Sequence, residues 1–187
     1  MSELPAWYPG TENKPAPMPL LRVQGFINTL DIEDGTDLLF LPAVARDWLV
    51  DAGLLRAGAA EPTASDLELA RAARESIRAL AADSADASLA SLRQVTAAHC
   101  ARLTVSDDGA VGLENGRGDE FGDALFELLL IVHRAQQDGT WSRLKVCANP
   151  DCQWAFYDRS RNQQGNWCNM AVCGNRLKNR ELRARRR

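Results

Sequence analysis

The sequence contains few of the residues from which enzyme active sites are usually built. It has only two histidines, His99 and His133, and no Gly-rich phosphate loop or paired-carboxylate signature accompanies them. His99 is followed by Cys100, but adjacent residues on a helix do not face one another. We therefore expect no catalytic residue and no enzymatic activity.

Long apolar runs are also scarce. The longest, from Leu125 to Val132, is interrupted by Glu127, whereas a membrane-spanning helix needs about 20 predominantly apolar residues. The first residues lack the cationic start and the apolar core of a secretory signal. We therefore predict a cytoplasmic protein without a membrane partner, in which paired cysteines are more often metal ligands than disulfides.

Acidic residues are rare near the C-terminus. Residues 142–187 contain eleven Lys/Arg and three Asp/Glu, a net charge of +8, whereas residues 1–141 contain eleven Lys/Arg and twenty-two Asp/Glu, a net charge of −11. Such a division predicts two parts with different roles. Only the basic part is suited to a polyanionic partner.

The order of elements can be predicted from proline, periodicity and turn signals. Residues 1–19 hold five of the eight prolines, and because proline blocks regular structure we expect an extended arm. Residues 20–139 show helical periodicity, including a helix with a capping box at Ser65–Glu68. The turn sequence Asp107–Gly109 between two short apolar segments predicts a β-hairpin. On the helix after Ser65, a stripe of Arg71, Arg74 and Arg78 is expected to be solvated or ion-paired.

Four of the five cysteines form two pairs with equal spacing, Cys147-x4-Cys152 and Cys168-x4-Cys173. Two such pairs can converge on one tetrahedral ion, and four thiolates are typical of a closed structural zinc site without catalytic activity. Iron could bind the same thiolates, but no cluster-type spacing is present. We predict one structural Zn²⁺ per chain. Trp167, beside Cys168, is expected to pack over this site.

Basic residues follow the second cysteine pair. No proline or glycine follows Gly174, so a short basic helix is expected. Guanidinium groups match phosphates and guanine edges, although a solvated basic tail is the alternative. The predicted nucleic-acid contacts are Arg159, Arg161, Asn175, Arg176, Lys178, Arg180, Arg183, Arg185 and Arg186.

The cysteine module resembles the CGNR zinc-finger family. The resemblance rests on the spacing of the four cysteines and on the runs Cys147–Cys152, Phe156–Asp158 and Cys173–Arg176. It implies a finger of residues 143–187, built from a β-hairpin and a helix in a treble-clef-like arrangement, that binds zinc and DNA. The sequence departs from the family at Gln163–Asn166, where more basic residues are expected.

Residues 20–139 are similar to the ABATE domain, the stress-induced-regulator type that precedes this finger. The similarity lies in Phe26–Leu30 and Asp37–Leu39, and together the two resemblances imply a bacterial transcription regulator. The predicted fold is α+β: a helix-rich N-terminal domain with a small hairpin, followed by the zinc finger.

The predicted function is DNA binding by the finger, with sensing or dimerisation by the N-terminal domain. Asn28 and Thr29, at the end of the first helix, could line the pocket of a small-molecule effector, or they could simply form a helix C-cap and turn. The expected partners are DNA, an effector and a second copy of the chain. A zinc-dependent protein-interaction module and an RNA-binding module are the alternatives, the latter because aromatic residues beside bases suit unstacked nucleotides.

Overall fold

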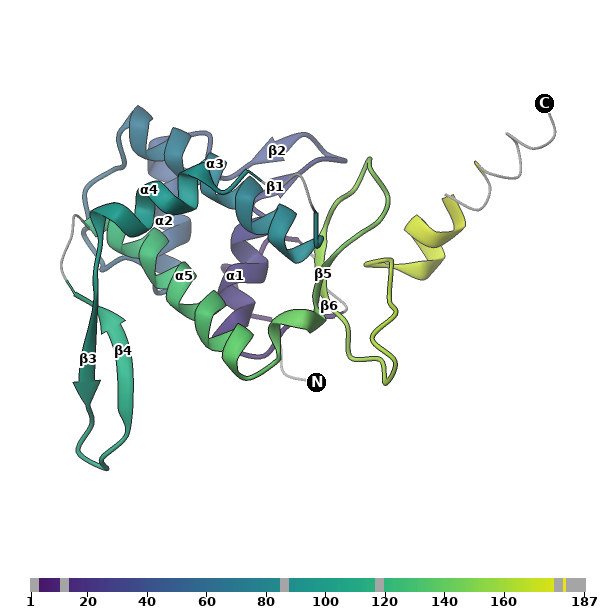
Figure 1. Ribbon diagram of the computed structural model, residues 1–187. Coiled ribbons are helices and arrows are strands. Elements are labelled where there is room, and N and C mark those ends of the chain that lie inside the picture. The colour runs from purple at the N-terminus through teal and green to yellow at the C-terminus, as the bar shows by residue number, and fades with distance from the viewer. Residues whose placement is uncertain (1–3, 11–13, 85–87, 117–119, 177–179, 181–187) are drawn as a thin grey trace.

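The computed structural model describes residues 4–10, 14–84, 88–116, 120–176 and 180, and Figure 1 shows their arrangement. Helices form the body of the molecule, and small antiparallel hairpins lie at its surface. The predicted α+β class is confirmed. The described elements are α1 (Leu20–Ile27), β1 (Leu30–Asp31), β2 (Thr36–Asp37), α2 (Pro42–Asp51), α3 (Ala64–Ala81), α4 (Ala90–Ala98), β3 (Ala101–Val105), β4 (Val111–Asn115), α5 (Glu120–Gln137), the 3₁₀ turn η1 (Trp141–Arg143), β5 (Leu144–Val146), β6 (Ala155–Tyr157) and the π-helical turn η2 (Met170–Gly174).

The core forms around α1, which contacts α3, α5 and strand β6. Val23, Phe26 and Ile27 are fully buried, as are Leu128 and Ile131 of α5. Their helical spacing gives each helix an apolar stripe that must be covered by a neighbour. No helix in the described ranges combines the length and apolarity needed to cross a membrane.

The start of α3 differs from the prediction. Thr63 is the N-cap, its hydroxyl accepts the Asp66 backbone N–H, and the Asp66 carboxylate accepts the Thr63 backbone N–H. The capping box predicted at Ser65–Glu68 was therefore wrong by two residues. Thr63–Asp66 and Ser65–Glu68 both place a hydroxyl residue three positions before a carboxylate. Thr63, however, adopts the extended backbone conformation of an N-cap, whereas Ser65 already lies in the first turn of α3.

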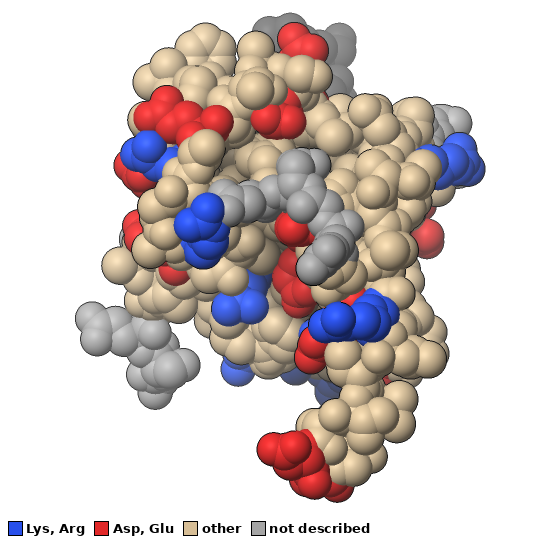
Figure 2. Space-filling view, turned by 90° about the vertical axis from the view of Figure 1, so that its left-hand side faces the viewer, with Lys and Arg blue, Asp and Glu red and all other residues tan. Residues whose placement is uncertain are grey.

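The three described two-stranded sheets are hairpins. The predicted hairpin is confirmed as β3–β4, in which Leu103 pairs with Leu113 and Gly109 takes a left-handed φ of 84° in the turn. This hairpin projects from the helical body in Figure 1. Figure 2 shows acidic atoms gathered at its tip. The other hairpins, β1–β2 and β5–β6, lie against the body.

The N-terminal arm and the β5–β6 hairpin share the core of the helical part. Strand β6 contacts α1, and β5 contacts α3. The Tyr157 backbone N–H donates to the Lys14 carbonyl at 2.8 Å, so the arm runs beside β6. At its other end, the Trp7 carbonyl accepts a 2.9 Å hydrogen bond from Trp48 Nε1.

Candidate metal centre

The four predicted zinc ligands converge in the structure. The sulfur atoms of Cys147, Cys152, Cys168 and Cys173 all lie within 4.8 Å of one another. Cys168 Sγ is 3.7 Å from both Cys152 Sγ and Cys173 Sγ. A tetrahedral zinc with Zn–S bonds of about 2.3 Å requires sulfur separations of about 3.8 Å. The cluster therefore has the size and donor set of a structural zinc site.

Local turns aim polar hydrogens at these sulfurs. The backbone N–H of Asn149 bonds Cys147 and that of Trp154 bonds Cys152, two residues after each cysteine. The buried Asn149 side chain lies 3.9 Å from Cys173 Sγ. Such outer hydrogen bonds orient thiolate ligands and help to hold their charge.

The cysteines are electrostatically coupled. Hydrogen bonds from the Cys152 and Cys168 thiols lower the pKa of Cys147 to about 2. Because the Cys152 and Cys168 thiols donate these hydrogen bonds to the Cys147 sulfur, the pKa of Cys152 is raised to about 12 and the pKa of Cys168 is also raised. Without a metal, these shifts favour a Cys147 thiolate beside protonated Cys152 and Cys168 thiols, and a bound divalent cation would favour their ionised forms.

Aromatic residues cover the cluster. Trp154 and Trp167 are partly buried and pack against Cys147, Cys152 and Cys173, so the packing role predicted for Trp167 is confirmed. A Cβ on Gly174 would lie 3.2 Å from Trp167 Cδ1 and 2.5 Å from Met170 Sδ. Glycine after the fourth cysteine therefore permits this close approach.

Asp158 shapes the loop between the two cysteine pairs. Its carboxylate accepts the backbone N–H groups of Ser160 at 2.9 Å and Gly165 at 2.7 Å, and lies 3.4 Å from Lys145 Nζ. Burial alone would raise the pKa of Asp158, but these hydrogen bonds outweigh it and hold the pKa well below the ordinary value. The loop therefore depends on an ionised Asp158.

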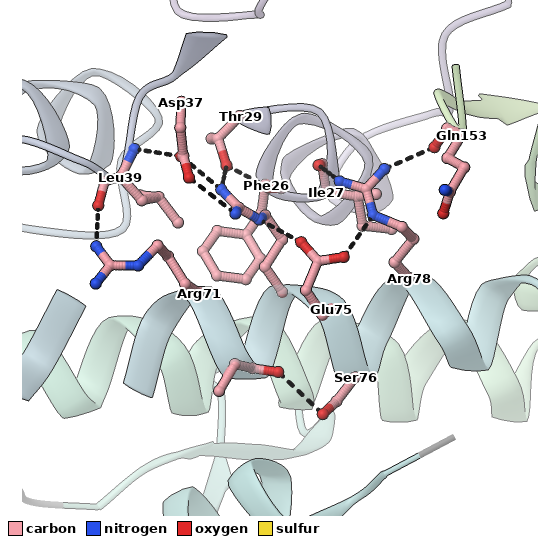
Figure 3. Close-up of polar contacts among 12 residues, drawn as sticks. Phe26, Ile27, Thr29, Asp37, Leu39, Arg71, Glu75, Ser76, Arg78 and Gln153 are labelled. Atoms are coloured by element: carbon pink, nitrogen blue, oxygen red, sulfur yellow. Dashed lines mark hydrogen bonds and ion pairs between the residues drawn. The ribbon is translucent and has the colours of Figure 1, made fainter. Parts of the chain in front are cut away.

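A buried polar network connects α3 with the backbone at Gln153, as Figure 3 shows. The Arg78 side chain, 4% exposed, donates to the Gln153 carbonyl at 2.6 Å, to the Ile27 carbonyl at 2.9 Å and to Glu75 at 3.0 Å. Gln153 directly follows Cys152 and has a left-handed φ of 51°. Arg78 thus fixes the backbone beside a zinc ligand.

The same network continues toward β2. Arg74, with a side chain 3% exposed, bonds both carboxylate oxygens of Asp37, at 2.6 Å and 3.0 Å, and donates to Glu75 and Thr29. The predicted ion pairing is confirmed for Arg74 and Arg78, whereas Arg71 donates to the Leu39 carbonyl at 2.8 Å. The alternative, a solvated face, is wrong for Arg74 and Arg78 because the chain following α1 covers them.

Asn28 joins α1 to β6. Its amide donates to the Ala155 carbonyl and to Tyr8 Oη, both at 2.9 Å, while its Oδ1 accepts the Ala155 N–H at 2.7 Å. Thr29 donates to the Phe26 carbonyl at 2.8 Å. Both side chains lie on the wall of a cavity of about 550 Å³, although their polar groups already have protein partners.

Comparison with known families agrees with this arrangement. The family model described as "Putative stress-induced transcription regulator" (ABATE) matches residues 23–136, more than half of the chain. The chain belongs to the ABATE family. The model for the CGNR zinc finger matches residues 143–186, so this ABATE protein carries a CGNR finger whose four cysteines bind one structural zinc. The family description names a transcription regulator rather than an enzyme. No curated protein matches the chain.

The predicted nucleic-acid contacts lie around the finger wherever the structure describes them. Arg159 and Arg161 are exposed in the loop after β6, and Asn175, Arg176 and Arg180 are exposed on helical backbone after Cys173. Arg159 donates to the Pro15 carbonyl at 2.8 Å. Lys178, Arg183, Arg185 and Arg186 lie outside the described residues.

The contacts that hold the finger against the ABATE part were not predicted: Gln24 was not singled out in the sequence, and Asn28 was expected to line a pocket or to cap a helix. Gln24 donates to the Ala155 carbonyl at 3.1 Å and accepts the Ala16 N–H at 2.6 Å. Gln24 and Asn28 lie one turn apart on the buried side of α1. Polar residues at predicted core positions usually have hydrogen-bond partners, and this spacing was the available signal.

Proposed function

We propose that this ABATE-family regulator binds duplex DNA through its zinc finger and the basic segment that follows Cys173. The observation that carries the proposal is the placement of this segment directly after a zinc ligand. Its backbone is helical at Asn175, Arg176 and Arg180. In Figure 1 the turn η2, which leads into this segment, lies on the side of the body opposite to the β3–β4 hairpin. A metal-fixed helix can present its bases in one orientation.

The described arginines of this segment are accessible. The Arg176 side chain is 54% exposed and pairs with Glu33 at 2.5 Å, and the Arg180 side chain is 61% exposed and pairs with Asp151 at 2.5 Å. Exposed ion pairs contribute only about 0–1 kcal/mol. A DNA phosphate can therefore replace either carboxylate, because two N–H groups of the same guanidinium can then donate to two phosphate oxygens.

The loop after β6 offers a further contact. The Arg159 guanidinium carbon lies 6.0 Å from the Tyr157 ring centroid, and its bond to Pro15 leaves other N–H groups of the guanidinium for a phosphate. Arg161 is exposed two residues further on. We assign both arginines to backbone contacts, which position a protein on DNA without specifying sequence.

The remaining features of the proposal concern regulation. A cytoplasmic ABATE part would bind a small effector or a second copy of the chain and alter DNA affinity. The network from Asp37 through Arg74 and Glu75 to Arg78 supports such coupling, because it ends on the backbone beside Cys152. Dimerisation would add base contacts that one small finger lacks.

The test is fluorescence anisotropy with labelled duplex DNA, using zinc-loaded full-length protein. If five or six bases each neutralise a phosphate, log K against log salt should have a slope of about −4 to −5. The double variant R176A/R180A should reduce that slope by about 2. Arg102→Ala is the matched control, because Arg102 is exposed on β3, away from the finger.

Two further measurements separate the alternatives. A chain truncated after Asn175 should retain zinc and lose duplex binding. Duplex binding that survives truncation would contradict the proposal. Equal or tighter binding of single-stranded RNA would favour the RNA-binding alternative, and salt-independent binding would exclude phosphate recognition.

A further inference from the structure

The cavity beside Asn28 has an unusual lining. Its volume is about 550 Å³, and it opens between the N-terminal arm, the β1–β2 hairpin and α2. This is within the range of small-molecule sites. Aromatic rings from three separate segments, Trp7, Trp48 and Trp154, contribute to its wall. The described lining residues include four aspartates and no Lys or Arg.

Helix α2 contributes one face to this cavity. Val44, Asp47, Trp48 and Asp51 all line it, and their spacing places them on one side of the helix. Asp51 is the last residue of α2, and no basic residue occupies the final turn. A carboxylate there opposes the helix dipole. This arrangement lowers the stability of the helix but increases the negative potential of the cavity.

The carboxylates are partly available to a ligand. Asp47 pairs with Arg46 at 2.8 Å. Asp31 Oδ1 accepts the backbone N–H groups of Glu33 and Asp34. Within the described part of the chain, the side chains of Asp34 and Asp51 have no hydrogen bond or ion pair. Both groups line the cavity, and no described Lys or Arg forms an ion pair with either of them.

The aromatic rings are held in fixed orientations. The Trp7 and Trp48 rings are 6.2 Å apart and nearly perpendicular, at 85°, and the bond from Trp48 Nε1 to the Trp7 carbonyl anchors the pair. Gly25 permits this arrangement, because a Cβ there would lie 2.8 Å from Trp7 Cζ3. Trp48 is 5% exposed, so it fixes the orientation of the more exposed Trp7 ring, whose surface a compact group in the cavity can contact.

We propose that this cavity binds a small organic ammonium cation. Aromatic faces attract alkylated ammonium groups by about 0.5–2 kcal/mol each, more when water is excluded, and Asp34 and Asp51 supply the opposite charge. Neither feature favours an anion, and a neutral ligand would use only the apolar area. The proposal concerns ligand binding alone and stands or fails independently of DNA binding.

The experiment compares choline with its neutral isostere 3,3-dimethylbutan-1-ol, by calorimetry and tryptophan fluorescence on the zinc-loaded full-length protein. We expect choline to bind at least about tenfold more tightly, since only the positive charge differs. The double variant Asp34→Asn/Asp51→Asn should weaken choline binding at least about fivefold. It should leave the affinity for the alcohol unchanged and should retain zinc.

The matched control is Asp107→Asn/Asp108→Asn, at the tip of the projecting β3–β4 hairpin, which should leave choline binding unchanged. Equal affinity for choline and the alcohol would overturn the proposal. So would choline binding that is insensitive to the Asp34 and Asp51 changes, or the absence of choline binding at about 10 mM, where even a weak cation–aromatic site is occupied.

Discussion

Replacing Asn28 with alanine tests whether the ABATE part holds the finger in place. Asn28 is 1% exposed, and its amide pairs with both backbone groups of Ala155, at 2.7 Å and 2.9 Å. Ala155 begins β6, three residues after the zinc ligand Cys152. Asn28→Ala therefore removes an amide that makes the two hydrogen bonds a neighbouring strand would make with Ala155.

The expected cost follows from the groups left behind. The Ala155 carbonyl keeps its bond from Gln24 at 3.1 Å, but the buried Ala155 N–H loses its partner. An unsatisfied buried donor costs about 1–3 kcal/mol, and the lost bond to Tyr8 adds about 1 kcal/mol. We expect the free energy of unfolding to fall by about 2–4 kcal/mol. Because β6 follows the first cysteine pair, zinc affinity should also fall, by about tenfold.

The assay is urea unfolding in the presence of zinc, followed by competition with a colorimetric zinc chelator. Asn162→Ala is the matched control, because Asn162 is exposed in the loop after β6 and should change stability by less than about 0.5 kcal/mol. If Asn28→Ala behaves like this control in both measurements, the inferred coupling between α1 and the finger is wrong.

Three other predictions follow from the buried charges and the metal. Asp37→Asn removes one of the two carboxylates that pair with the buried guanidinium of Arg74 and leaves Glu75 as the other, so it should cost about 1.5–3 kcal/mol in urea unfolding; a loss below about 0.5 kcal/mol would show that Glu75 alone balances the charge of Arg74. Asp158 has a lowered folded-state pKa, so its stabilisation is complete above the unfolded value of about 4 and is lost as the pH falls further toward the folded value. The stability difference between wild type and Asp158→Asn should therefore be constant from about pH 5 to 7 and shrink below about pH 4, and a pH-independent difference would refute this. Cys173→Ser should reduce bound zinc well below one equivalent by elemental analysis, whereas Cys100→Ser should leave it at one, since Cys100 is exposed and lies outside the cluster.

The metal centre was predictable because its information is local. Two equally spaced cysteine pairs can close on one ion whatever the rest of the fold does, and the structure places all four sulfurs together. The β3–β4 hairpin was predictable for a similar reason, since Asp107–Gly109 specifies a turn between adjacent segments. The exact N-cap of α3 was missed because Thr63 and Ser65 begin competing patterns of equal quality.

The division into arm, ABATE part and finger remains a prediction, but the contacts cross all three segments. The Lys14 carbonyl accepts from Tyr157, and Arg78 donates to Gln153, across 143 and 75 positions respectively. Periodicity describes which face of a helix is apolar and carries no information on such distant partners.

Local patterns thus define the zinc ligands, the helices and the concentration of positive charge, because each depends on residues that are close together in the chain. The burial of Arg74 and Arg78, the pairing of Asn28 with Ala155 and the aromatic cavity depend on which distant segments meet. Those outcomes follow from the requirement that every polar group enclosed by packing must find a partner, and a linear pattern does not name that partner.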